Sequence, residues 1–166
     1  VDGKFIGLRW KAYHNVGAYI VGAGAVPVVF SLKLSQTVYD VPAVDVMSSA
    51  VFTNTPPTVP YRGAGRPEAV YIMERLIDTA AHEMGIDRAE IRRKNFIKPD
   101  QMPYDNPTGW TYDTGDYAAA LDKNLSQSDW DGYESRQAAS AAAGKQRGRG
   151  VVYYVDNTGI FNERME

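Results

Sequence analysis

The chain has 166 residues and a formal net charge of −2, from 18 lysines and arginines and 20 aspartates and glutamates. With 44% hydrophobic and 23% charged residues, the composition is that of a globular domain with a sizeable core. The cations are scattered and no apolar run approaches the roughly 20 residues of a membrane helix, so no nucleic-acid patch and no membrane span are expected. The absence of cysteine excludes disulfides, thiolate metal sites and cysteine-ligated iron–sulfur clusters within this chain.

The first third of the sequence is rich in strand signals. Apolar and polar residues alternate over residues 5–13, which predicts a strand. Residues 15–30 are glycine-rich and apolar, and they are expected to form a loop and a short helix. Two further strands are predicted at residues 38–41 and 44–53, because both runs are rich in valine and other strand-forming residues. The prolines at 56 and 57 end the second run.

The pattern becomes helical at Pro67. Apolar residues recur at helical spacing from there to Met84, proline suits the first turn of a helix, and Gly85 suits its end. Asp87 is followed three residues later by Glu90, a capping pattern that predicts a second, short helix through residue 94.

The remaining sequence predicts a loop, two helices and a strand. Residues 98–113 hold three prolines and read as loop, residues 114–125 and 129–143 as helices, and residues 150–155 as a strand. The predicted fold class is therefore α+β, with mixed short sheets and about four helices.

Three short motifs carry little weight. His82-Glu83 begins like a zinc motif but lacks the second histidine, and the chain has only two histidines in all. Gly22-Ala23-Gly24 lacks the third glycine of a dinucleotide-binding loop. The basic turn at residues 144–150 is expected to be a solvated turn.

Residues 62–66, Arg-Gly-Ala-Gly-Arg, combine several features of an anion site. The glycines permit backbone angles closed to other residues, the helix starting near Pro67 offers free N–H groups, and the arginines add forked donors. Such a corner suits a phosphate, a pyrophosphate or an anionic metal-oxo group. The alternative, which the residues alone leave equally open, is a plain turn whose arginines pair with Glu68 or Asp78.

The run YRGAGRPEA at residues 61–69 resembles the active-site loop of the molybdenum hydroxylases, the family of xanthine dehydrogenase, aldehyde oxidase and aerobic carbon monoxide dehydrogenase. The resemblance extends through residues 85–97, where Arg88 replaces the usual proline, and through residues 103–117. Upstream, residues 2–4, 15–19 and 39–42 fit as well. It therefore spans nearly the whole chain, in matching order and spacing.

The resemblance implies roles for individual residues. Arg62 would lie on the substrate side of the metal as the catalytic residue and stabilise developing negative charge. Cofactor binding would fall to the four residues that follow it, which are Gly63, Ala64, Gly65 and Arg66. Phe96 would flank the substrate, with core packing as a nearly equal alternative. A copper-binding cysteine of one carbon monoxide enzyme would stand at position 63, so an aldehyde or aromatic heterocycle is the expected substrate.

The resemblance also implies cofactors, partners and organisation. Residues 1–166 would be a single middle piece of a large molybdopterin-binding subunit: strand-rich at 1–60, active-site loop and helices at 61–125, and helix plus strand at 126–166. Molybdopterin with molybdenum, in its cytosine dinucleotide form, is expected in the full protein and not bound tightly by this piece, which alone would be inactive.

Iron–sulfur and flavin subunits or domains, a second large subunit and a small-molecule substrate are the expected partners, in the cytoplasm. The alternative to this oxidoreductase is a free-standing anion-binding or scaffold domain without catalysis.

Overall fold

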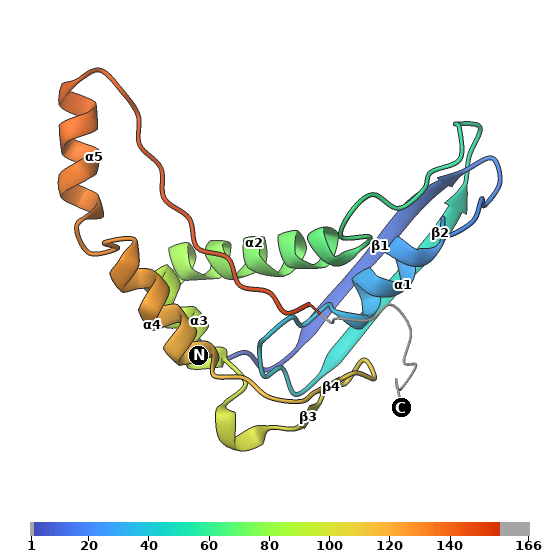
Figure 1. The fold of residues 1–166 in the computed structure, drawn as a ribbon, viewed down its shortest axis with the longest axis horizontal. Helices are drawn as coiled ribbons and strands as arrows, with labels where there is room; N and C mark the ends of the chain where they lie inside the picture. The colour runs from blue at the N-terminus through green and yellow to red at the C-terminus, as the bar shows by residue number, and fades with distance from the viewer. Residues whose placement is uncertain (1, 157–166) are drawn as a thin grey trace.

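A computed structural model describes residues 2–156. The chain begins with a two-stranded parallel sheet, β1 (Leu8–Gly17) and β2 (Val44–Phe52), whose connection contains helix α1 (Val26–Lys33). Parallel strands need such a crossover, and α1 lies along one face of the sheet (Figure 1). The strands predicted at residues 5–13 and 44–53 are thus confirmed, although β1 begins at residue 8 and continues to residue 17. The short helix expected within residues 15–30 is α1, which continues to residue 33.

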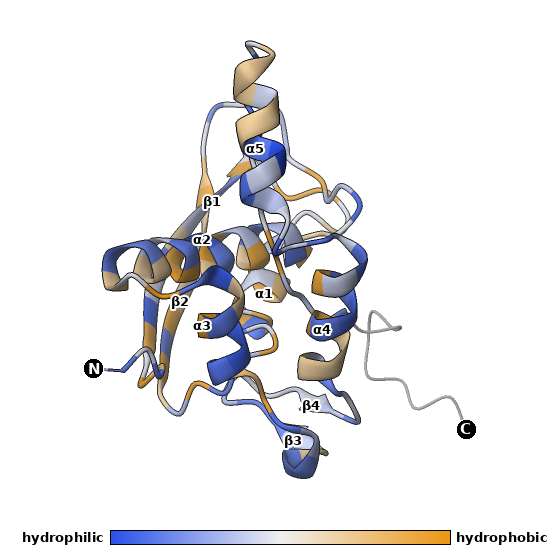
Figure 2. Cartoon of the chain, turned by 90° about the vertical axis from the view of Figure 1, so that its left-hand side faces the viewer, coloured by the Kyte–Doolittle hydropathy of each residue, from blue (hydrophilic) through white to orange (hydrophobic). Residues whose placement is uncertain are grey.

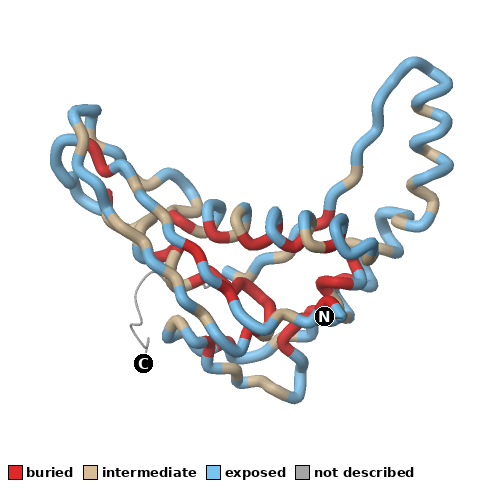
Figure 3. The backbone as a smooth tube through the Cα atoms, turned by 180° about the vertical axis from the view of Figure 1, so that it is seen from behind, coloured by how far each residue is buried: buried red, intermediate tan, exposed pale blue. Residues whose placement is uncertain are grey.

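Helix α2 (Arg66–Met84) and helix α3 (Arg88–Asn95) follow as the sequence predicts. Pro67 lies in the first turn of α2, and Gly85 ends it with a left-handed φ of 65°. The Asp87 carboxylate accepts hydrogen bonds from the backbone N–H groups of Ala89 (2.7 Å) and Glu90 (3.2 Å) at the start of α3. One face of α2 is buried and the other exposed, which matches its alternating hydropathy (Figures 2 and 3).

A buried polar network joins α2, α3 and the segment after α1. The Arg92 guanidinium donates to Glu74 (Nε to Oε2, 2.8 Å) and to Asp78 (Nη2 to Oδ1, 2.8 Å), and the Tyr39 hydroxyl donates to Glu74 Oε1 at 2.5 Å. Burial raises the pKa of Glu74, opposed by Arg92. Burial lowers the pKa of Arg92, but Glu74 and its other neighbours outweigh it, so the net shift is upward. The network fixes the angle between the two helices.

Asn95 ties the N-terminal segment to the end of α3. Its amide nitrogen donates to the Gly3 carbonyl (2.7 Å) and the Ile91 carbonyl (2.8 Å), and its oxygen accepts from the Phe5 N–H at 2.7 Å. The side chain is fully buried, so these bonds replace the water it loses.

A short hairpin supports the C-terminal end of α1. After the 3-10 helix Pro99–Gln101, strands β3 (Tyr104–Asp105) and β4 (Thr111–Tyr112) pair antiparallel. Within the loop between them, Asn106 and Thr108 both donate to the Lys33 carbonyl, at 3.3 and 2.5 Å. This part of the chain was expected to be loop alone.

Helices α4 (Tyr117–Gln127) and α5 (Tyr133–Ala142) complete the described chain. Helix α5 projects from the body and has no buried residue (Figures 1 and 3). The chain then returns in an extended form across the body, and the Tyr153 hydroxyl donates to the Tyr117 carbonyl at 2.8 Å.

The core lies between the sheet and α2, α3 and α4. It contains, among others, Leu8, Trp10, Met73, Ile77, Ile91 and Leu121. The α+β class is confirmed, with five α-helices within residues 2–156 where about four were expected. None of the helices in that range is long and apolar enough to cross a membrane.

Two predicted strands are wrong. Val38, Tyr39 and Val41 are buried, but residues 38–41 make only one isolated bridge, Tyr39 to Phe96, because the network around Tyr39 holds the segment against helices. Residues 150–155 show the expected alternating burial but pair with no strand within residues 2–156. In both segments the apolar pattern reflects burial of side chains, which does not require sheet hydrogen bonds.

The start of α2 packs tightly against α1 at Gly65. This residue has a φ of 94°, and a Cβ atom placed on it would lie 2.3 Å from the Pro27 carbonyl oxygen and 2.8 Å from the Ser31 nitrogen. Only glycine fits a position that is both left-handed and this close to another backbone. The contact fixes the loop before α2 relative to α1.

Replacing Arg92 with methionine is expected to destabilise the protein by about 3–5 kcal/mol, because Glu74 and Asp78 lose a buried cationic partner. The matched control is Arg93→Met on the same helix. Arg93 is partly exposed and pairs with Glu90 and Asp122, so its loss is expected to cost less than about 1 kcal/mol. Urea denaturation followed by tryptophan fluorescence measures both, and equal costs would contradict the assigned role of the network.

Gly65→Ala is expected to cost at least twice as much as Gly85→Ala. Both glycines have positive φ, but a Cβ at Gly85 meets no atom within 4 Å, so that control carries only the strain of about 1–2 kcal/mol. At Gly65 the backbones of α1 and α2 must also move apart. Thermal unfolding of the two variants compares them, and equal shifts in Tm would show that the α1 contact is loose.

Candidate functional site

The loop before α2 has an unusual backbone. The Ala64 N–H donates to the Tyr61 carbonyl at 3.0 Å, which closes a turn, and three consecutive residues have positive φ: Gly63 at 99°, Ala64 at 42° and Gly65 at 94°. A positive φ is uncommon for alanine and costs backbone energy, which the surrounding packing must offset. The loop is therefore held in one defined shape at the N-terminal end of α2.

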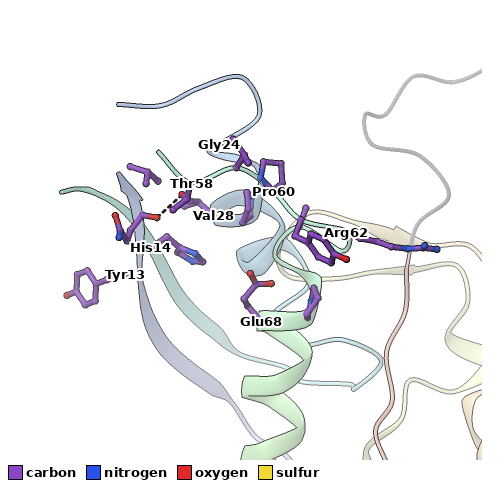
Figure 4. Close-up of a pocket in the computed structure, with 15 residues that line it drawn as sticks. Tyr13, His14, Gly24, Val28, Thr58, Pro60, Arg62 and Glu68 are labelled. Carbon is purple, nitrogen blue, oxygen red and sulfur yellow. Dashed lines mark hydrogen bonds between the residues drawn. The ribbon is translucent and has the colours of Figure 1, made fainter. Parts of the chain in front are cut away.

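A cavity of about 540 Å³ opens beside this loop. Its walls come from the end of β1, the first turns of α1 and α2, and the segment between β2 and α2 (Figure 4). Arg62, Ala64 and Pro67 line it, whereas Gly63, Gly65 and Arg66 do not. The structure thus brings two of the five predicted loop residues to a common cavity.

The two arginines of the loop have different surroundings. Arg62 is exposed, extends away from the centre of the cavity in Figure 4, and has no ion pair within residues 2–156. Arg66 is largely buried: its guanidinium lies 4.3 Å from the ring centre of Phe30, pairs with Asp156, and places Nη1 3.4 Å from the Gly63 carbonyl it donates to. The contacts of Arg66 are therefore within the protein, and they stabilise the loop.

The alternative of a plain turn closed by Glu68 or Asp78 does not describe this corner. Asp78 pairs with Arg92 and Arg88, while Glu68 has no ion pair or hydrogen bond in the described part of the chain. The spaces beside the loop glycines are filled by protein. A Cβ on Gly63 would lie 2.7 Å from the Pro67 ring, and the space beside Gly65 is occupied by α1. The glycines provide the turn rather than an open cradle.

His14 is a cavity residue that sequence reasoning passed over. It lies on β1, and its Nε2 is 3.2 Å from the hydroxyl of Ser31, a fully buried residue of α1. Ser48 on β2 approaches the same hydroxyl at 3.4 Å. These residues are far apart in the sequence and belong to no motif, so only the crossover that brings β1, α1 and β2 together could reveal them.

Phe96 occupies the core. Its ring stacks on Tyr39 with centroids 5.6 Å apart and contacts Tyr153 at 4.9 Å, and only 4% of the residue is exposed. These contacts support the core-packing alternative. The substrate-flanking role stays a prediction.

The remaining motifs have structural surroundings. The Arg149 guanidinium of the basic turn lies over the ring of Trp130, 4.2 Å from its centre, and over the ring of Tyr133, 4.4 Å from its centre. His82 is exposed on α2, and no group of three or more histidine, aspartate or glutamate side chains in residues 2–156 could hold a metal ion.

Comparison with known proteins identifies the family of the chain. The family model described as a molybdopterin cofactor-binding domain matches residues 1–96. The carbon monoxide dehydrogenase large chain of Hydrogenophaga pseudoflava is 37% identical over 172 aligned residues, covering 99% of this chain and 21% of that protein. The nicotine 6-hydroxylase large subunit of Paenarthrobacter nicotinovorans is 29% identical over 161 residues, covering 95% of this chain and 20% of that protein.

The solved structures agree. The quinoline 2-oxidoreductase from Pseudomonas putida 86 matches with a TM-score of 0.78 and 32% identity, over 86% of this chain and 18% of that one. The chain spans about a fifth of the length of the curated relatives it matches. Because the family model covers more than half of the 166 residues, the chain belongs to the molybdopterin cofactor-binding domain family, to which the resemblance of its active-site loop pointed.

Proposed function

We propose that the chain is part of the large subunit of a molybdenum-dependent hydroxylase or dehydrogenase. The enzyme oxidises an aldehyde or an N-heterocycle and takes the added oxygen from water. The observation that carries the proposal is the loop at residues 61–67, which resembles the active-site loop of this family and which the fold holds in a strained shape beside a cavity of about 540 Å³.

Only some residues of the loop are placed to contact a cofactor that approaches from the cavity. Ala64 lines the cavity with a methyl group and a left-handed backbone, so a bulky group can come close to the main chain there. Gly63 and Gly65 make this shape possible, with their outer spaces filled by Pro67 and α1. We therefore assign the backbone of Gly63 and Ala64 to the molybdopterin cofactor, Arg62 to the substrate side of the metal, and bracing of the loop to Gly65 and Arg66.

Molybdenum held by molybdopterin, when bound, supplies the two-electron redox chemistry of substrate oxidation. The chain itself supplies position and charge. The N-terminal end of α2 adds a partial positive charge beside the cavity. The Arg62 side chain is exposed and carries a forked set of donors, so it can turn toward an anionic group and stabilise negative charge as it develops on the substrate.

The substrate class follows from residue 63. A copper-bound cysteine in this position would favour carbon monoxide, but the residue is glycine and the chain has no cysteine. The resemblance therefore favours an aldehyde or an aromatic N-heterocycle, and the relatives named for quinoline and nicotine support the heterocycle.

The cofactor form, the partner subunits and the location are proposed from the resemblance to the same family. We propose the cytosine dinucleotide form of molybdopterin, iron–sulfur and flavin subunits that carry the electrons away, a pair of large subunits, and a cytoplasmic location. The lack of cysteine supports a separate iron–sulfur subunit or domain, because the cysteine ligands of such clusters cannot come from this chain.

Arg62→Ala is expected to lower kcat/KM for the preferred aldehyde or heterocycle by about 10²-fold, because the developing charge loses its donor. Arg62→Lys is expected to recover only part of the loss, since lysine keeps the charge but not the fork. Steady-state kinetics on the intact enzyme measure both, with the molybdenum content of each variant determined alongside. The control is Arg75→Ala on the exposed face of α2, which is expected to change neither quantity. Full activity of Arg62→Ala at unchanged molybdenum content would overturn the role of Arg62.

A further inference from the structure

The outer edge of β1 carries a row of backbone groups that do not face β2. Successive residues of a strand direct their N–H and C=O groups to opposite edges. The register pairs Leu8 with Val44, and the Leu8 N–H donates to the Ala43 carbonyl at 2.8 Å. The even-numbered residues of β1 therefore bond to β2. The backbone groups of the odd-numbered residues point away from it, and these residues are Arg9, Lys11 and Tyr13.

The same register leaves a second open row on β2. Its odd-numbered residues bond to β1, so the outer edge is formed by the backbone of Val44, Val46, Ser48 and Ala50. No other segment within residues 2–156 forms a ladder with either outer edge. The Asn15 carbonyl, at the end of the outward row of β1, accepts from the Thr58 hydroxyl at 2.9 Å, which agrees with the direction assigned to the odd-numbered residues.

The two strands lack most of the features that protect an exposed edge. Strand β1 has ten residues and β2 has nine, neither contains proline, and the irregularity in their pairing comes only between Asn15 and Gly17. Arg9 and Lys11 are charged, but their side chains lie on the outer face and leave the edge itself open. Two strands alone make a marginal sheet, and parallel pairs are normally found within larger sheets. Long open edges of this kind pair readily with a further strand.

The outer face of the sheet is suited to water rather than to a second layer. Helix α1 lies on the opposite face (Figures 1 and 2). On the outer face Arg9 Nε lies 2.7 Å from Asp45 Oδ2, and both side chains are more than two-thirds exposed, at 79% and 71%. A covering layer would remove this ion pair from water at a cost. The exposed Tyr13 and Met47 on the same face are placed to contact side chains of adjacent strands. The sheet is therefore open to extension at its edges.

We propose that β1 and β2 are inner strands of a larger sheet, and that the strands on both sides belong to the same large subunit, outside residues 1–166. The chain spans about a fifth of the length of the curated relatives it matches, so most of a subunit of that size lies outside these residues. A strand of the same polypeptide is present at a high effective concentration while the marginal two-stranded sheet folds, which favours it over a strand from another protein. The inference requires a longer subunit but not the molybdenum chemistry proposed above.

Hydrogen exchange of the intact enzyme, measured at single amides by mass spectrometry with electron-transfer fragmentation, tests the edges. On β1 the outward amides are those of Lys11 and Tyr13, and the inward amides of Trp10 and Ala12 are matched controls on the same strand. All four are expected to exchange at least about 10²-fold more slowly than in an unfolded chain. On β2 the same result is expected for the outward amides of Val46 and Ser48 and their inward controls, Met47 and Ser49. Outward amides that exchange faster than their inward neighbours on either strand would overturn the proposal.

Photo-cross-linking identifies the polypeptide that supplies the neighbouring strand of β1. The intact enzyme carries p-benzoylphenylalanine in place of Tyr13, an exposed aromatic residue of β1, and an unirradiated sample is the control. Irradiation is expected to join this position to a peptide of the same large subunit outside residues 1–166, with no change in the mass of the subunit on a denaturing gel. A cross-link to a second large subunit or to another protein, or cross-links only within residues 1–166, would contradict the proposal.

Discussion

The buried ion pair between Glu74 and Arg92 is the constraint on which the rest of the structure depends. Arg92 is fully buried, and its guanidinium is bonded to Glu74 and Asp78 on α2 and to the Arg88 carbonyl on its own helix. The Tyr39 hydroxyl completes the cluster from the segment between α1 and β2. A charge removed from water needs all of these partners, so α2 has little freedom to rotate or slide. The loop before the N-terminal end of α2 is therefore held in a fixed orientation as well.

The loop itself is fixed from two sides. Gly65 lies against the backbone of α1, and Arg66 spans Phe30, Asp156 and the Gly63 carbonyl. This division leaves Arg62 as the arginine available for chemistry. Arg62 extends away from the centre of the cavity, whereas the His14 ring and the Glu68 side chain face it (Figure 4).

The sequence predicted the helix ends that depend on neighbouring residues alone. The start and end of α2 follow from Pro67 and Gly85, and the start of α3 follows from the Asp87 cap. The positive φ at Gly63 and Gly65 was expected from their residue type.

What failed depends on contacts between distant segments. The buried run at residues 38–41 looks like a strand because burial and sheet pairing leave the same apolar pattern, and the fate of Arg66 was decided by Phe30 and Asp156, which lie 36 residues before it and 90 after it. The contacts of His14 with Ser31 and Ser48 cannot be read from the sequence for the same reason, because the three residues come from three different elements.

The proposed function depends on the loop at residues 61–67 facing a molybdenum cofactor. The direct measurement is a crystal structure of the intact holoenzyme with the metal located by anomalous scattering at the molybdenum edge. A single molybdenum peak is expected beside Arg62 and Ala64, and a peak remote from this loop, or none in an active enzyme, would contradict this placement.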